Sequence, residues 1–130
     1  FARHADRVTW IPTVPRSEIP AIMAAHDVLV FPSYFEGSAL SLIEALASGM
    51  AVIQTRAAGN GATAQTGLVL DAPSTEGLRD AIASAIDNRQ LVDEWRAAAQ
   101  GEAQRYSFAA YRAGIAALLT DLEGREPSSA

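Results

Sequence analysis

Two glutamates separated by seven residues are the side chains in this chain best suited to chemistry. Glu36 and Glu44 border a run of small and apolar residues, and no other charged residue lies between them. Two turns of α-helix span about seven residues, so both carboxylates can face one cleft if Glu36 lies in a loop just before a helix that carries Glu44. In that arrangement the two acids would bracket a single ligand.

The backbone between the two acids adds a second kind of binding group. Gly37 lets a ligand approach the main chain closely. Ser38, Ala39 and Leu40 fall at the start of a predicted helix, where the first N–H groups have no partner within the helix. These N–H groups and the positive end of the helix dipole favour an anion such as a phosphate.

Both glutamates also have structural interpretations, which the pattern leaves about equally open. Glu44 lies three residues after Ser41, which is the spacing of a capping box, in which the acid bonds back to the start of its helix. Glu36 could be a solvated loop residue. The spacing alone does not decide between binding and structure.

Few side chains outside this segment indicate chemistry. Gln54 and Arg56, at the end of a predicted strand, could contact a phosphate or a base, although a lone surface arginine is more often only solvated. His26 precedes a strand at the opposite end of the sheet and is interpreted as a solvated loop residue. Trp10 and Trp95 are interpreted as packing residues.

Short β-branched runs alternate with helical patterns, which predicts an α/β domain with a parallel sheet covered by helices. The predicted strands are residues 8–11, 28–31, 51–54 and 67–70. The run at 28–31 is apolar without alternation, which indicates a central strand buried on both faces. Ligands of such sheets bind at the carboxyl ends of the strands, where Glu36 is expected.

Helices fill the rest of the predicted domain. Ser17 caps a short helix over 18–23, a second helix over 38–48 ends at Gly49, Ser74 or Thr75 caps a third, and a fourth covers 89–105. The third helix and a fifth carry apolar stripes interpreted as core-facing, namely Leu78, Ala81, Ile82, Ala85 and Ile86, and Phe108, Tyr111, Ile115, Leu118 and Leu122. One domain is expected over 1–123, with a frayed tail at 124–130.

Composition excludes several classes of protein. The net charge is -5 and the ten basic residues are all scattered arginines, which argues against a nucleic-acid partner. With no Cys and two His there is no basis for a disulfide framework or a zinc cluster. No apolar run approaches the ~20 residues of a membrane span. The chain begins with Phe1, without a signal-peptide pattern, and reads as a piece of something longer.

From Val8 to about Phe108 the chain resembles the carboxyl-terminal, donor-binding domain of retaining GT-B-fold glycosyltransferases, the group that includes glycogen synthase. The resemblance rests on residues 27–33, 36–53 and 66–69. The middle stretch matches that family's motif of two glutamates separated by seven residues in its full context, which is highly specific. The expected fold is therefore the later part of a Rossmann-like domain.

The resemblance implies a task for each site residue. Glu36 would be the catalytic residue and would contact the donor sugar. Glu44 would accept hydrogen bonds from the ribose hydroxyls. Gly37, Ser38, Ala39 and Leu40 would offer backbone N–H groups to the sugar and diphosphate of a nucleotide-sugar donor. Neither a metal nor another cofactor is implied, and the expected location is cytoplasmic, with or without peripheral binding to the inner membrane.

The chain also departs from the family's pattern. The family supplies an arginine and a lysine for the diphosphate from upstream strands, and this chain contains no Lys. The amino-terminal, acceptor-binding domain is also missing. We therefore expect the 130-residue chain alone to lack transferase activity. The alternative interpretation is a non-catalytic nucleotide-sugar-binding or interaction module.

Overall fold

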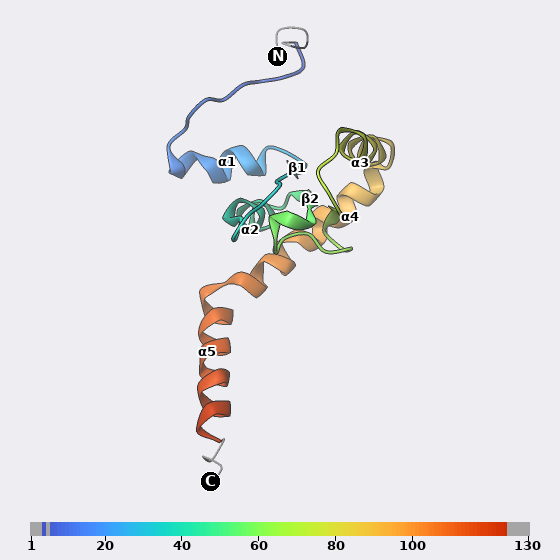
Figure 1. Ribbon diagram of the computed structural model, residues 1–130. Coiled ribbons are helices and arrows are strands. Elements are labelled where there is room, and N and C mark those ends of the chain that lie inside the picture. Colours follow the sequence, from blue (N-terminus) through green and yellow to red (C-terminus); the bar gives the residue numbers. More distant parts are fainter. Residues whose placement is uncertain (1–3, 5, 125–130) are drawn as a thin grey trace.

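A computed structural model describes residue 4 and residues 6–124, whose centre is a parallel sheet of three strands (Figure 1). The strands β1 (Val28–Phe31), β2 (Ala51–Thr55) and β3 (Gly67–Leu70) follow one another in the order β1-β2-β3. All pairings are parallel, and helices connect or flank the strands. The predicted α/β, Rossmann-like class and three of the four predicted strands are confirmed.

The central strand is β2, not the predicted run at 28–31. All five residues of β2 are buried, whereas every residue of β1 is half-buried. The reason is topological: β2 has a hydrogen-bonded neighbour on both sides, while β1 has one among the described residues. Continuous apolar sequence shows that a strand is shielded on its faces, but it does not show how many neighbours pair with it.

The predicted strand at residues 8–11 is wrong. These residues form no strand, and the side chain of Trp10 is 69% exposed, so its interpretation as a packing residue is wrong as well. A β-prone run becomes a strand only where a neighbour supplies hydrogen bonds, and the segment runs outside the three-stranded sheet. Trp95, in contrast, is buried as predicted.

The first helix is built differently from the prediction. A 3-10 turn, η2 (Arg16–Glu18), leads into α1 (Ile19–Ala24). Ser17 lies inside this turn, and the N-cap residue of α1 is Glu18, which makes no side-chain capping bond. The predicted cap at Ser17 is therefore wrong.

Two helices enclose one face of β2. They are α2 (Leu40–Ala47) and α4 (Arg89–Ala103), and their buried residues pack with Val52. As predicted, α2 is followed by Gly49, whose positive φ of 78° suits a residue without a side chain. However, α2 begins two residues later than expected, with Ala39 as its N-cap.

A second apolar cluster on the opposite face joins the sheet to α3 (Thr75–Asp87) and α4. The predicted cap of α3 is confirmed, because the Ser74 hydroxyl accepts a hydrogen bond from the Gly77 N–H. Its predicted stripe faces the core only in part: Ala81 and Ala85 are buried, but Ile86 is exposed.

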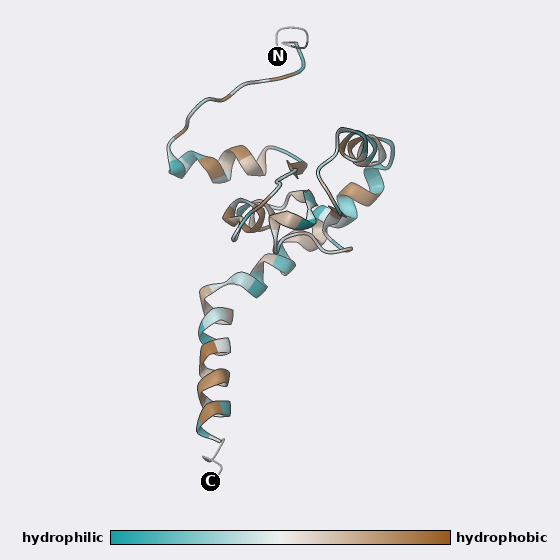
Figure 2. Ribbon diagram, in the orientation of Figure 1, coloured by the Kyte–Doolittle hydropathy of each residue, from teal (hydrophilic) through white to brown (hydrophobic). Residues whose placement is uncertain are grey.

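The last helix, α5 (Phe108–Glu123), projects away from the rest of the molecule (Figure 1). Its apolar residues are conspicuous in Figure 2, and none of its residues is buried. The prediction that its stripe faces the core is therefore wrong for the part of the chain that the structure describes. Helical periodicity reveals an apolar face without revealing what covers it. The expected tail lies outside the described residues apart from Gly124.

None of the helices within the described ranges combines the length and apolar character needed to cross a bilayer.

Candidate functional site

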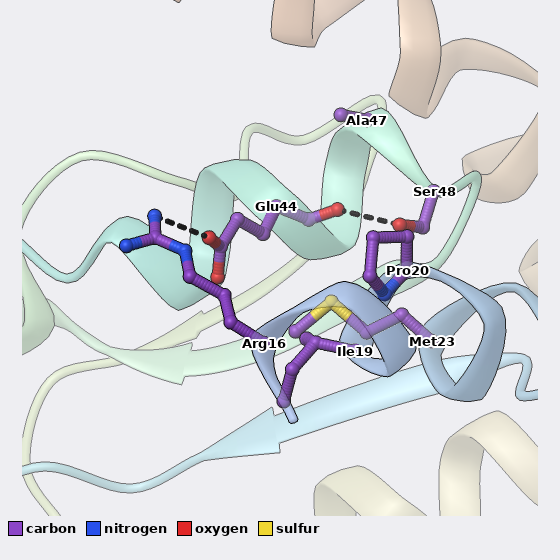
Figure 3. A pocket seen from close by; sticks show the side chains of 7 residues that line it. All are labelled: Arg16, Ile19, Pro20, Met23, Glu44, Ala47 and Ser48. Carbon is purple, nitrogen blue, oxygen red and sulfur yellow. Dashed lines mark hydrogen bonds and ion pairs between the residues drawn. The ribbon is translucent and has the colours of Figure 1, made fainter. Parts of the chain in front are cut away.

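Glu44 lines a pocket between α1 and α2 (Figure 3). The pocket encloses about 290 Å³, and Ile19, Pro20 and Met23 contribute much of its apolar lining. An adjoining pocket of about 400 Å³ also contains Glu44 and extends along α2 to Leu40. A small-molecule site typically has this character: mostly apolar walls and one or two placed charges.

Arg16 faces Glu44 across this pocket. Its Nη2 atom lies 3.6 Å from Oε1 of Glu44, and the two side chains are 88% and 43% exposed. Figure 3 shows the guanidinium and the carboxylate pointing toward one another, above the side chains of α1. Arg16 was not predicted as a site residue, and only its proximity in the fold brings it to Glu44.

The capping-box interpretation of Glu44 is wrong. Because α2 begins at Leu40, Ser41 lies within the helix, and the N-cap of α2 makes no side-chain hydrogen bond. The backbone of Glu44 is held instead by the Ser48 hydroxyl, which donates to the Glu44 carbonyl oxygen at 2.8 Å. The carboxylate is therefore oriented toward the pocket rather than toward the helix start.

Glu36 lies in the exposed loop that follows β1. The Ser33 hydroxyl is 3.2 Å from Oε1 of Glu36 and 3.1 Å from the carbonyl oxygen of Phe35. The Glu36 N–H donates to the carbonyl oxygen of Ala57, 3.1 Å away, in the loop after β2. Glu36 is thus held through both its side chain and its backbone, although it is solvent-exposed. That Glu36 and Glu44 face one ligand stays a prediction.

The segment between the acids has an open surface. A Cβ atom added to Gly37 would meet no atom within 4 Å, so a ligand has room to approach the main chain there. Ser38 and Leu40 are also exposed, whereas Ala39 is buried. The Leu40 N–H already donates to the Ser38 carbonyl oxygen at 3.1 Å, so one of the expected amide donors is engaged within the chain.

The two polar residues expected near the end of β2 have partners within the protein. Gln54 is buried and bonds to the loop that follows, so the structure does not present it to a ligand. Arg56 is exposed, and its Nη2 atom lies 2.6 Å from Oδ1 of Asp71. A ligand contact by Arg56 stays a prediction.

The opposite, amino-terminal end of the sheet has a cluster of charges that serves structure. Asp27, just before β1, accepts a hydrogen bond from Nη2 of Arg89 at 2.8 Å and forms an ion pair with Nη1 of Arg96 at 3.0 Å. The hydrogen bond from Arg89 lowers the pKa of Asp27, and Arg96 adds to this effect against the opposing influence of burial. His26, beside it, is exposed, as predicted. Within the described ranges, no three His, Cys, Asp or Glu residues are grouped to hold a metal.

Comparison with known proteins shows which family the chain is similar to. The family model described as glycosyl transferases group 1 matches residues 2–102. A D-inositol 3-phosphate glycosyltransferase from Corynebacterium glutamicum is 32% identical over 123 residues, which cover 92% of this chain and 29% of that protein. A GDP-mannose-dependent alpha-(1-6)-phosphatidylinositol monomannoside mannosyltransferase from Mycobacterium tuberculosis is 35% identical over 111 residues, covering 78% and 28% respectively.

A solved structure agrees with this picture at the level of the fold. Sucrose-phosphate synthase from Thermosynechococcus elongatus matches with a TM-score of 0.73 and 24% identity, over 92% of this chain and 31% of that one. The chain therefore spans less than a third of the length of these proteins.

Proposed function

The chain belongs to the glycosyl transferases group 1 family, and we propose that it forms the donor-binding part of a cytoplasmic enzyme that transfers a sugar from a nucleoside diphosphate to an acceptor. The observation that carries this proposal is the placement of Glu44 on a pocket with apolar walls, one helical turn after Leu40, the first residue of α2, which follows the open backbone at Gly37 and Ser38. A nucleoside needs an apolar surface for its base and a polar acceptor for its ribose, and this pocket offers both.

The nucleoside would lie between α1 and α2. Its base would pack against Ile19 and Met23, and the Glu44 carboxylate would accept hydrogen bonds from the ribose hydroxyls. Hydrogen bonds to a charged acceptor are stronger than those between neutral groups. The exposed Arg16 would lose little by exchanging its pairing with Glu44 for one with the ligand, because surface ion pairs contribute little to stability.

The diphosphate and sugar would extend from the pocket past the start of α2. Backbone N–H groups near Gly37 and Ser38, with the positive end of the helix dipole, favour the negative charge that develops on the leaving diphosphate. Glu36, oriented by Ser33, would contact the sugar.

We further propose that transfer retains the anomeric configuration. The acceptor oxygen forms its bond to the anomeric carbon on the face from which the diphosphate departs. The bond between that carbon and the phosphate oxygen breaks, and the acceptor's proton passes to the leaving diphosphate. The chain's part in this step is to position the donor and to stabilise the departing charge.

The first experiment is a binding survey with the full-length enzyme that carries this chain. UDP, GDP and ADP are titrated calorimetrically, followed by their glucose and mannose derivatives. We expect saturable binding of at least one diphosphate and of a matching nucleotide sugar, with sugar transfer to an acceptor detected by mass spectrometry. Binding without transfer to any acceptor would favour the non-catalytic nucleotide-sugar-binding module, and the absence of binding throughout would refute both the transferase and that module and leave the interaction module.

A further inference from the structure

Gln54 is a buried amide at the edge of the apolar cluster between β2 and α2. Its side chain is 1% exposed and shares the face of β2 that packs against α2, where Val52 joins the apolar cluster. A buried amide is retained at low energetic cost only if its donor and acceptor both find partners. Its partners therefore show what the residue holds in place.

Both ends of the Gln54 amide bind one loop. Nε2 donates to the carbonyl oxygen of Gly59 at 2.8 Å, and Oε1 accepts from the N–H of Ala62 at 2.7 Å. Residues 59–62 follow the short 3-10 turn η3 (Arg56–Ala58) at the carboxyl end of β2. A single side chain thus fixes the entrance and the exit of this loop.

The loop packs so closely on Gln54 that it has no freedom to shift inward. A Cβ atom added to Gly61 would lie 2.2 Å from Oε1 of Gln54 and 2.9 Å from Cδ1 of Leu42, in the first turns of α2. Glycine is therefore required for the close approach at this position. The loop is held between β2 and the beginning of α2.

The turn η3, which lies between Gln54 and this loop in the chain, holds the backbone of Glu36. The carbonyl oxygen of Ala57 accepts the Glu36 N–H at 3.1 Å. A second connection comes from Thr55, whose hydroxyl donates to the carbonyl oxygen of Ser33, and the Ser33 hydroxyl in turn contacts the Glu36 carboxylate. The end of β2 therefore reaches Glu36 by two routes, one through the backbone and one through side chains.

We propose that Gln54 is a positioning residue for the donor sugar: by fixing the loop after β2, it holds Ala57 and, through it, the backbone of Glu36. This inference rests on the proposed function, because it assigns Gln54 to the sugar side of the donor site. Glu44 lies on the pocket between α1 and α2, which Gln54 does not line, and these hydrogen bonds do not connect the two residues. Gln54 should therefore affect binding of the sugar more strongly than binding of the nucleoside diphosphate.

The test is a double-mutant cycle in the full-length enzyme. Gln54→Met keeps the length of the side chain and removes both hydrogen bonds. We expect it to weaken binding of the nucleotide sugar about tenfold, the loss that corresponds to one charge-assisted contact. Binding of the nucleoside diphosphate should change less than about twofold, within the scatter of independent sites. Gln65→Met, the same change at a nearby exposed glutamine, should alter neither.

The cycle is completed in a Glu36→Ala background. If Gln54 acts through Glu36, Gln54→Met should no longer affect binding of the nucleotide sugar there, because interacting residues are non-additive. Equal losses for diphosphate and nucleotide sugar, or additive losses in the double mutant, would overturn the proposal.

Amide hydrogen exchange provides a readout that does not depend on the ligand. In Gln54→Met, the amides of Glu36 and Ala62 should exchange faster, while the Val52 amide, bonded to Thr66 within the sheet, should keep its protection. Unchanged exchange at Glu36 would overturn the positioning role even if the enzyme binds donors. If the wild type binds no nucleotide sugar, the proposed function fails, and this exchange measurement still decides whether Gln54 holds Glu36.

Discussion

Arg16 and Glu44 come from different elements and meet across the candidate nucleoside pocket, with 3.6 Å between the guanidinium and the carboxylate. Both side chains are substantially exposed, so the pair contributes little to folding. A charged pair that stabilises the protein little and lines a pocket is well placed to exchange partners when a ligand arrives. The consequence is that Glu44 can be changed with little effect on the fold.

Glu44→Gln should therefore weaken binding of the nucleoside diphosphate while leaving stability nearly unchanged. The substitution keeps the shape of the side chain and removes a charged acceptor, a loss of about 1–3 kcal/mol in binding. Calorimetric titration of both proteins, together with thermal melts, measures the two effects separately.

Glu76→Gln is the matched control for this substitution. Glu76 is an exposed residue in the first turn of α3, on a different element from the pocket, and its change should leave ligand affinity unaltered. Equal affinity in wild type and Glu44→Gln would remove Glu44 from the ligand site.

Asp27→Asn should destabilise the protein by about 0.5–1 kcal/mol at neutral pH, a value kept small because the ion pairs of Asp27 are partly exposed to solvent. The folded state lowers the pKa of Asp27 below its ordinary value of 3.8. Its contribution is therefore fully present well above pH 3.8 and is lost as the pH falls through that value toward the lower pKa of the folded state.

Urea unfolding at pH 7 and pH 3 checks this dependence. The difference in the free energy of unfolding between wild type and Asp27→Asn should be smaller at pH 3 than at pH 7. Asp93→Asn, which removes a longer contact to Arg96 of 3.9 Å, should have a smaller effect at both. If the difference in the free energy of unfolding between wild type and Asp27→Asn is the same at both pH values, the charge of Asp27 does not stabilise the fold.

The sequence predicted correctly the strands that pair with other strands in the described sheet. The segments that it misassigned are those that make few contacts with the rest of the described fold. Residues 51–54 formed β2 as expected because β1 and β3 pair with them on both sides. Residues 8–11 have a comparable β-prone composition but no place in the sheet. The apolar stripe of α5 is likewise real but unburied. Composition and period record local preference, whereas burial depends on contacts that only the fold defines.

The candidate site shows the same division. Glu36, Glu44 and the intervening glycine could be found from their spacing and motif. Arg16 and Gln54 could not, because Arg16 lies 28 positions before Glu44 along the printed sequence and Gln54 acts through loop hydrogen bonds. The sequence indicated Gln54 only by its place at the end of a predicted strand, as a contact to a phosphate or a base, whereas the structure shows its amide bonded to the loop that follows η3.

Leu118→Ser on α5 should change the free energy of unfolding of the 130-residue chain by less than about 0.5 kcal/mol, as for other surface substitutions. The side chain is 54% exposed and α5 contributes no buried residue. Urea denaturation measures the change, with Val92→Ala in the buried part of α4 as the contrasting variant. A loss as large as that of Val92→Ala would show that α5 packs against another surface in solution.

Two leucines on α2 should separate the requirements of folding from those of the pocket. Leu42 is fully buried between α2 and β2, and Leu40 is 61% exposed beside Glu44 in the adjoining pocket. Leu42→Ala leaves a cavity in the core and should lower the free energy of unfolding by about 2–5 kcal/mol. Leu40→Ala removes only partly exposed apolar surface and should lower it by less than about 1 kcal/mol.

Because Leu40 lines the pocket, its removal should instead weaken nucleoside diphosphate binding, measured by titration in the full-length enzyme. Equal losses of stability for the two variants would place Leu40 in the core, contrary to its exposure.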